Sequence, residues 1–151
     1  MYIIAEIGVN HDGDLNKALK LIDAAVDCGC NAVKFQSFYA ERLVHSSALK
    51  VDYQLRSNSA KESHFEMIKR LEFNGQKFLQ AFNYSKKRKI DFITTPYDPL
   101  SAFESYKLGV RNFKTASADL SDLYLHNYLS NLDDIDLYIA TGMSALNQIK
   151  N

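Results

Sequence analysis

The stretch AVKFQSF, residues 32–38, is an apolar run that ends in polar side chains. The same pattern recurs in IIAEIGVNHDG (3–13), FITTPYD (92–98) and FKTASAD (113–119). Parallel α/β sheets place their ligand sites at the carboxyl ends of their strands. The repetition of one pattern in four places therefore predicts a single pocket to which several strands contribute. The residues expected near its rim are Glu6, Lys34, Gln36, Thr95, Lys114, Ser117 and Asp119.

Composition limits the classes of protein to consider. The chain has 151 residues, 46% of them hydrophobic, which is enough for the core of one domain. Its 18 basic and 18 acidic residues balance, so no broad surface for nucleic acid is predicted. A small anion would have to be held by a few placed cations. The opening run MYIIAEIG is too short for a leader or a membrane span, and we expect no membrane partner.

Two cysteines, Cys28 and Cys30, lie one residue apart near the end of a predicted helix. This spacing suits neither a structural disulfide nor a metal site. The sequence therefore predicts reduced thiols and a cytoplasmic location.

Strands and helices are expected to alternate along the chain. The predicted strands are residues 2–6, 32–36, 91–95, 111–115 and 136–141. Helices are predicted after the N-cap Asp14, over 64–73 and 75–88, from Pro99 to Gly109, over 123–131 and from Ser144. Residues 37–63 are expected to form a long polar segment, because they show no sustained periodicity. Strict β-then-α order favours a parallel sheet with right-handed crossovers. Two folds are compatible with this order: a complete flavodoxin-like open sheet or the first part of an eight-stranded barrel. The pattern alone favours the flavodoxin-like sheet.

Five motifs resolve this choice: IAEIGVNHDG, VKFQSF, FITTPYD, FKTASAD and ATGMS. In order and spacing they resemble the N-acetylneuraminate (sialic acid) synthase family, which includes the legionaminate and pseudaminate synthases. The resemblance implies parallel (β/α) units of a TIM-type barrel, truncated after about five strands. Residues 1–151 would be its amino-terminal portion. The remaining strands and a small C-terminal antifreeze-like domain would be absent.

By the same resemblance, the family condenses phosphoenolpyruvate with an N-acetylated aminosugar to a nonulosonic acid. Lys34, Lys114 and Ser117 would bind phosphoenolpyruvate, whose phosphate and carboxylate need converging cations and hydroxyls. Gln36 resembles the glutamine that contacts the aminosugar, and Thr95 and Tyr97 are expected to line the sugar side of the pocket.

Glu6 and Asp119 are the predicted catalytic carboxylates. Glu6 lies in an apolar first strand, where its charge needs a partner such as Lys34. Asp119 stands where relatives commonly have glutamate, and Ala140 where they often have serine. The shorter Asp119 side chain puts substrate choice or rate in doubt. His11, in the first turn, is expected to order its own loop in preference to binding metal.

The resemblance also implies a divalent metal, Mn²⁺ or Mg²⁺, whose ligands come from later strands, so we expect no metal ligands in this chain. Turnover by the chain alone is therefore not expected. Unpaired edges at the first and fifth strands predict a homodimer or a complementing chain. The alternative is a non-catalytic half-barrel that serves as a binding or assembly module, or one half of a split enzyme.

Overall fold

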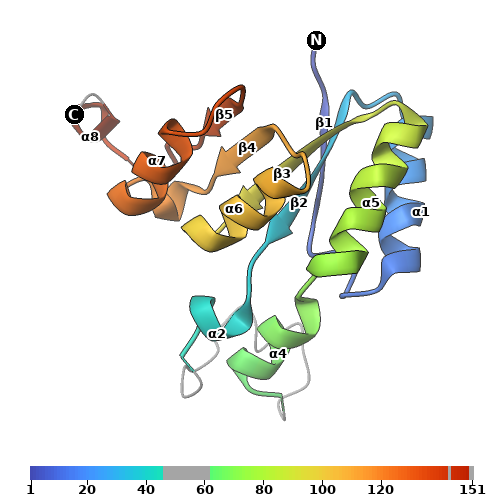
Figure 1. The fold of residues 1–151 in the computed structure, drawn as a ribbon, viewed down its shortest axis with the longest axis horizontal. Coiled ribbons are helices and arrows are strands. Elements are labelled where there is room, and N and C mark those ends of the chain that lie inside the picture. The colour runs from blue at the N-terminus through green and yellow to red at the C-terminus, as the bar shows by residue number, and fades with distance from the viewer. Residues whose placement is uncertain (46–61, 143, 150–151) are drawn as a thin grey trace.

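The computed structural model describes residues 1–45, 62–142 and 144–149. Its sheet has five strands, β1 (Ile4–Gly8), β2 (Ala32–Ser37), β3 (Asp91–Pro96), β4 (Asn112–Thr115) and β5 (Asp136–Ile139). Every neighbouring pair is parallel, and the spatial order β1-β2-β3-β4-β5 follows the chain. A flavodoxin-like sheet would instead have order 2-1-3-4-5. The prediction of successive (β/α) units of a TIM-type barrel is therefore confirmed (Figure 1).

Helices connect the strands. They are α1 (Leu15–Asp27), α2 (Ala40–Leu43), α4 (His64–Leu71), α5 (Gly75–Arg88), α6 (Pro99–Lys107), α7 (Leu123–Ser130) and α8 (Leu146–Ile149), with a 3₁₀ turn, η1 (Ser117–Asp119), after β4. Helices α1 and α5 lie side by side against the sheet, while α2 and α4 lie together beyond the carboxyl end of β2 (Figure 1). None of the described helices is long and apolar enough to cross a membrane.

The core lies between the helices and one face of the sheet. Phe35, Phe92 and Phe113 project from successive strands toward this side, where Phe35 and Phe92 stack with ring centroids 5.0 Å apart. Phe78 and Phe82 of α5 meet Phe92 edge-on. Because side chains alternate along a strand, burial of this set directs the intervening residues to the opposite face.

Side-chain caps fix the starts of several helices. The carboxylates of Asp14, Asp98 and Asp122 accept from backbone N–H groups in the first turns of α1, α6 and α7. Ser63 and Glu66 form a reciprocal capping box on α4. Asn74 precedes α5 as predicted, but its side chain makes no capping bond and instead donates to the carbonyl of Phe38 at 2.8 Å.

Some predicted boundaries are wrong. The first strand begins at Ile4 and ends at Gly8, two residues beyond the prediction of 2–6, because a register shift between Glu6 and Gly8 lets Gly8 pair with Phe35. The polar segment 37–63 contains α2, which was not predicted. A four-residue helix is too short to produce a periodic pattern. Residues 46–61 of that segment lie outside the described residues.

Ion pairs tie the loops at the carboxyl end of the sheet to α4. Lys69 contacts Glu41 at 2.7 Å and Glu72 at 3.1 Å, and Arg70 contacts Asp12 at 2.9 Å. Exposed pairs such as these add little stability singly. Here they join the β1–α1 loop, α2 and α4 in one arrangement.

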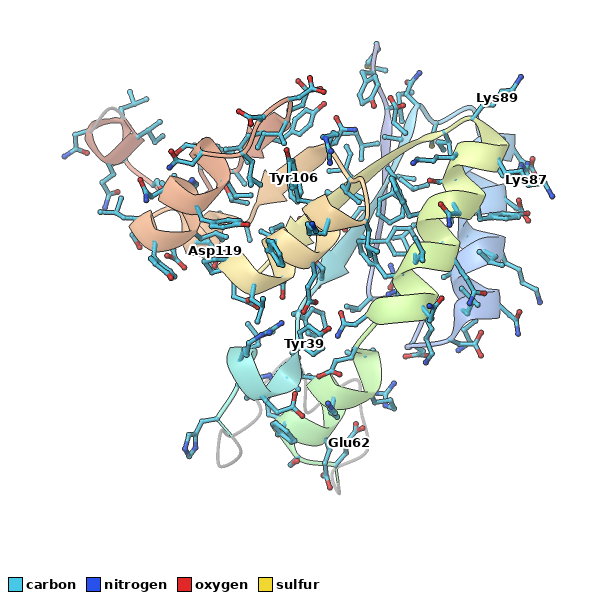
Figure 2. All side chains as sticks on the ribbon, in the orientation of Figure 1. Tyr39, Glu62, Lys87, Lys89, Tyr106 and Asp119 are labelled. Atoms are coloured by element: carbon cyan, nitrogen blue, oxygen red, sulfur yellow. The ribbon has the colours of Figure 1, made fainter. Side chains whose placement is uncertain are left out.

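A second set of contacts joins the segment after β2 to α6. Arg42 pairs with Asp98 at 3.4 Å and lies over the ring of Tyr39, 4.0 Å from its centroid. The hydroxyl of Tyr39, labelled in Figure 2, donates to Glu104 at 2.8 Å. The loops that follow β1, β2 and β3 are thereby held together at the carboxyl end of the sheet.

Gly13 provides a test of this loop packing. It has φ +71°, and a Cβ atom there would lie 2.3 Å from the backbone oxygen of Arg70. Gly29 has a similar φ of +76° with nothing within 4 Å, so it is a matched control. Gly29→Ala should cost about 1–2 kcal/mol for its left-handed backbone, and Gly13→Ala should cost about 1–3 kcal/mol more because the backbone must move. Equal losses in urea unfolding would show that the loop does not pack on α4 as described.

Candidate functional site

The predicted polar residues of β1, β2 and β3 share one face of the sheet. Glu6 is in register with Lys34, and Gln36 with Thr95. Register partners in a parallel sheet point to the same side, as do residues two apart on a strand. The four side chains therefore lie opposite the aromatic core, on the face that a closed barrel encloses.

Lys34 is the centre of this group. It is only 5% exposed, and its Nζ lies 2.6 Å from Oε2 of Glu6 and 3.0 Å from Oγ1 of Thr95. A buried ammonium group is costly unless it is paired and hydrogen bonded. The predicted pairing of Glu6 with Lys34 is therefore confirmed, and it fixes one cation between three strands.

Glu6 itself is not buried. Its side chain is 55% exposed although its neighbours in sequence are apolar. The reason is topological, because β1 is an edge of the sheet and its inner face is open in the described part of the chain. The desolvation cost is therefore mainly that of the buried Lys34 ammonium group, and the partly exposed Glu6 carboxylate supplies the compensating negative charge.

Gly8 allows the polar side chains to come close together. Its φ is +53°, and an added Cβ would lie 3.2 Å from Oε1 of Glu6 and 3.6 Å from Nε2 of Gln36. These distances also show that the Glu6 carboxylate and the Gln36 amide both lie close to this glycine. A larger residue at this strand end would both strain the backbone and displace them.

Lys114 brings β4 into the group. Its Nζ donates to the carbonyl of Thr115 at 3.2 Å. Partial burial lowers the pKa of Lys114, and the positive charge of Lys34 lowers it further, while Glu6 and Asp119 act in the opposite direction. Lys34, Glu6 and Asp119 thus all act on the pKa of Lys114.

The turn after β4 carries Ser117 and Asp119. An added Cβ on Gly142 would lie 3.2 Å from Oγ of Ser117, so the ATG segment after β5 passes directly over this hydroxyl. Burial raises the pKa of Asp119, and Lys114 opposes the rise. Oδ2 of Asp119 is buried and has no hydrogen-bond partner among the described residues.

The remaining predicted residues occupy different surroundings. Thr95 is 2% exposed and accepts from Lys34. The ring of Tyr97, directly after the carboxyl end of β3, meets that of Phe38 edge-on with centroids 6.0 Å apart. Ala140 donates its N–H to the carbonyl of Thr115 at 3.3 Å and has no hydroxyl to offer a ligand.

His11 orders its own loop, as predicted. Its Nδ1 accepts from the N–H of Gly13 at 2.9 Å, and its ring packs against those of Phe35 and Phe73, with centroids 5.8 Å and 4.3 Å away. Burial lowers the pKa of His11 to about 4, although the Gly8 backbone and Asp12 act in the opposite direction. The imidazole is therefore neutral at neutral pH, with its hydrogen on Nε2.

Within the described ranges, no group of three or more histidine, cysteine, aspartate or glutamate side chains could hold a metal ion. The divalent metal that the sequence resemblance implies thus does not fit the residues described, and no step of the chemistry is assigned to it. Cys28 and Cys30 are both free.

Sequence reasoning missed three residues that shape the site. Gly8 and Gly142 are close-approach points that appear in the sequence only as glycines ending the EIG and ATG stretches. His126 on α7 contacts the backbone oxygen of Asp119 at 3.1 Å. Its only sequence signal is a histidine in the first turns of the next helix, which is too weak to identify it.

Comparison with known proteins agrees with this fold. The NeuB family model matches residues 21–151, and the chain belongs to the NeuB family. It is 38% identical to N,N'-diacetyllegionaminic acid synthase of Campylobacter jejuni over 148 residues, covering 98% of this chain and 44% of that protein. The corresponding synthase of Legionella pneumophila is 35% identical over 150 residues, covering 99% and 42%.

A solved structure shows the same architecture. The crystal structure of N-acetylneuraminic acid (sialic acid) synthetase from Leptospira borgpetersenii, in complex with citrate, superposes with a TM-score of 0.82 at 30% identity, covering 99% of this chain and 47% of that one. The present chain thus spans less than half the length of the relatives it matches.

The proximity of the two lysines can be tested without a ligand. Removing the charge of Lys34 in Lys34→Met should raise the pKa of Lys114, because Lys34 lowers it, and Glu6→Gln should lower the same pKa. The measurement is the ¹³Cε chemical shift of Lys114 as a function of pH. Lys107→Met, at an exposed position on α6, is the control and should leave it unchanged. No change in either test variant would contradict the described geometry.

His11 should make stability depend on pH. Its folded pKa of about 4 lies below the ordinary 6.5, so the unfolded chain binds a proton more readily. The contribution is fully present above pH 6.5 and is lost as pH falls toward 4, up to about 3 kcal/mol of unfolding free energy. Urea unfolding between pH 7 and 4 should show a shallower slope in His11→Phe than in wild type. The exposed His45→Gln is the control, and a slope in His11→Phe equal to that of wild type would argue against a neutral buried His11.

Proposed function

We propose that this chain is the amino-terminal portion of a phosphoenolpyruvate-condensing synthase of the sialic acid type. The reaction would join phosphoenolpyruvate to an N-acetylated aminosugar and form a nonulosonic acid, a carbon–carbon bond-forming transfer. Support comes from the family membership, from the activities named for the Campylobacter and Legionella relatives, and from the polar face of the sheet.

The observation that carries the proposal is the convergence of two lysines on one open face. Lys34 is held by Glu6 and Thr95, and it lowers the pKa of Lys114. Two ammonium groups brought together at a partly buried site repel each other in the absence of a ligand. A ligand with both a phosphate and a carboxylate relieves that repulsion, and this is the charge pattern of phosphoenolpyruvate.

Roles for the individual residues follow from their positions. Lys34 and Lys114 would hold the two anionic groups, and Ser117, beneath Gly142, would donate its hydroxyl to one of them. Glu6 would keep Lys34 charged and oriented. Asp119 would serve the sugar carbonyl, since its raised pKa suits proton transfer near neutral pH better than that of an ordinary aspartate.

The proposed aminosugar contacts are assigned to the polar residues that lie next to Glu6 on the open face of the sheet. Gln36 lies next to Gly8 and Glu6 on the open face, and its amide offers both a donor and an acceptor. Thr95 of β3 is in register with Gln36, and Tyr97 directly follows the last residue of that strand. We propose that these three residues contact the aminosugar.

The assembly is also part of the proposal. The family's divalent metal would be held by residues outside those described here. Strands β1 and β5 are the edges of the described sheet, and their unpaired backbone groups would pair with further strands of the barrel, in the same protein, a complementing chain or a homodimer. Free Cys28 and Cys30 support a cytoplasmic location.

Calorimetric titration with phosphoenolpyruvate tests the proposal directly. Binding at sub-millimolar strength is expected, and Lys34→Ala and Lys114→Ala should each weaken it about tenfold to hundredfold, the effect of losing one charge-assisted bond. Lys87→Ala removes an exposed lysine of α5, labelled in Figure 2 on the far side of the molecule from α2 and α4, and should leave affinity unchanged.

Circular dichroism and light scattering should accompany the titration to confirm folding and fix the oligomeric state. A folded chain that gives no heat with phosphoenolpyruvate would contradict the assigned pocket. The alternative, a non-catalytic binding or assembly module, would then be the better account of the open face.

A further inference from the structure

Asp119 is held mainly through its backbone, although a backbone hydrogen bond at Ala116 also acts on its carboxylate and lowers its pKa. The carbonyl oxygen of Asp119 accepts from the N–H of Asp122 at 2.9 Å and lies 3.1 Å from Nε2 of His126. The side-chain oxygen Oδ2, by contrast, is buried without a partner among the described residues. The orientation of this carboxylate therefore depends on how firmly the η1 turn is fixed.

The hydrogen-bond chemistry assigns the tautomer of His126. A carbonyl oxygen can only accept, so Nε2 of His126 must carry the hydrogen. The contact with Asp119 is thus made by the Nε2–H group and does not involve Nδ1. Asp122 also caps α7 by accepting from the N–H of Leu125 at 3.0 Å. The turn and the first two turns of α7 thus form one hydrogen-bonded unit.

Few charged groups act on the Asp119 carboxylate. Asp122 raises the pKa of Asp119, whereas His126 and Lys114 lower it. On α6, which packs against α7, Glu104 is bound by Tyr39 and Lys107 is exposed. His126 therefore both contacts the backbone of Asp119 and lowers the pKa of its carboxylate.

We infer that His126 is a positioning residue for Asp119: its Nε2–H, hydrogen bonded to the Asp119 carbonyl, fixes the turn that carries Ser117 and Asp119. This inference rests on the proposed function for its catalytic meaning, because Asp119 is the carboxylate proposed to serve the sugar carbonyl. The contact itself is independent of that function. His126 touches no proposed substrate group and acts only through Asp119.

Two substitutions separate the hydrogen bond from the charge. His126→Gln keeps a side-chain N–H that can reach the carbonyl but cannot become charged, and His126→Leu removes both. Asn127→Leu places the same apolar residue at the next, exposed position of α7 and is the matched control. Circular dichroism of each variant confirms that α7 is intact.

The measurement is NMR of the full chain without ligand. The ¹³Cγ shift of Asp119, assigned with Asp119→Asn, gives its titration, and exchange of the Asp122 amide reports order in the turn. Both His126 variants should raise the midpoint of Asp119, because His126 lowers it. Amide exchange should be about tenfold faster in His126→Leu and close to wild type in His126→Gln. The control should change neither.

The outcomes distinguish this inference from the proposed function. If His126→Leu has the wild-type Asp119 midpoint and the wild-type Asp122 exchange, His126 does not position Asp119 and the inference is overturned, whatever phosphoenolpyruvate does. If both readouts move but wild type fails to bind phosphoenolpyruvate, the positioning stands and the proposed function fails. If exchange rises equally in both variants, the hydrogen-bonding role is rejected.

Discussion

The contact of Lys34 with Glu6 and Thr95 is the interaction on which the polar face of the sheet depends. A lysine ammonium that is almost completely buried must be paired, and these two partners come from the strands on either side. The pairing therefore requires β1, β2 and β3 to be in the observed register. A shift of one residue in β1 would send the Glu6 carboxylate into the aromatic core and leave the cation without its counter-charge.

Loop packing supports the same arrangement from the carboxyl end of the sheet. Ion pairs of Lys69, Arg70 and Arg42 connect the loops that follow β1, β2 and β3. Individually such contacts are weak, but together with the close approach of Gly13 to the Arg70 backbone they restrict how the rim can move. The functional side chains thus project from strands whose ends are held by their neighbours, which is the preorganisation that a small anionic ligand requires.

Much of the fold was predictable from residues that act locally. Asp14, Asp98 and Ser63 mark helix starts because a short polar side chain satisfies free backbone N–H groups, and these caps were found where expected or at the predicted helix boundary. Glu6 shows where such reasoning fails. Its apolar neighbours predict burial, but whether an edge strand is covered depends on elements far away in the chain. Likewise α2 is too short to produce a periodic pattern, and the contact of His126 with the backbone of Asp119 depends on how the turn after β4 leads into α7, which leaves no sequence pattern.

The sequence by itself determined the alternation of strands and helices, the parallel class of the sheet, and the residues that gather at the strand ends, because strand periodicity and capping are properties of short segments. The five motifs also identified the family. Only the tertiary structure decided the exposure of Glu6, the effect of Lys34 on the pKa of Lys114, and the attachment of Asp119 to His126. These depend on how strands, turns and helices pack against one another, which short stretches of sequence do not determine.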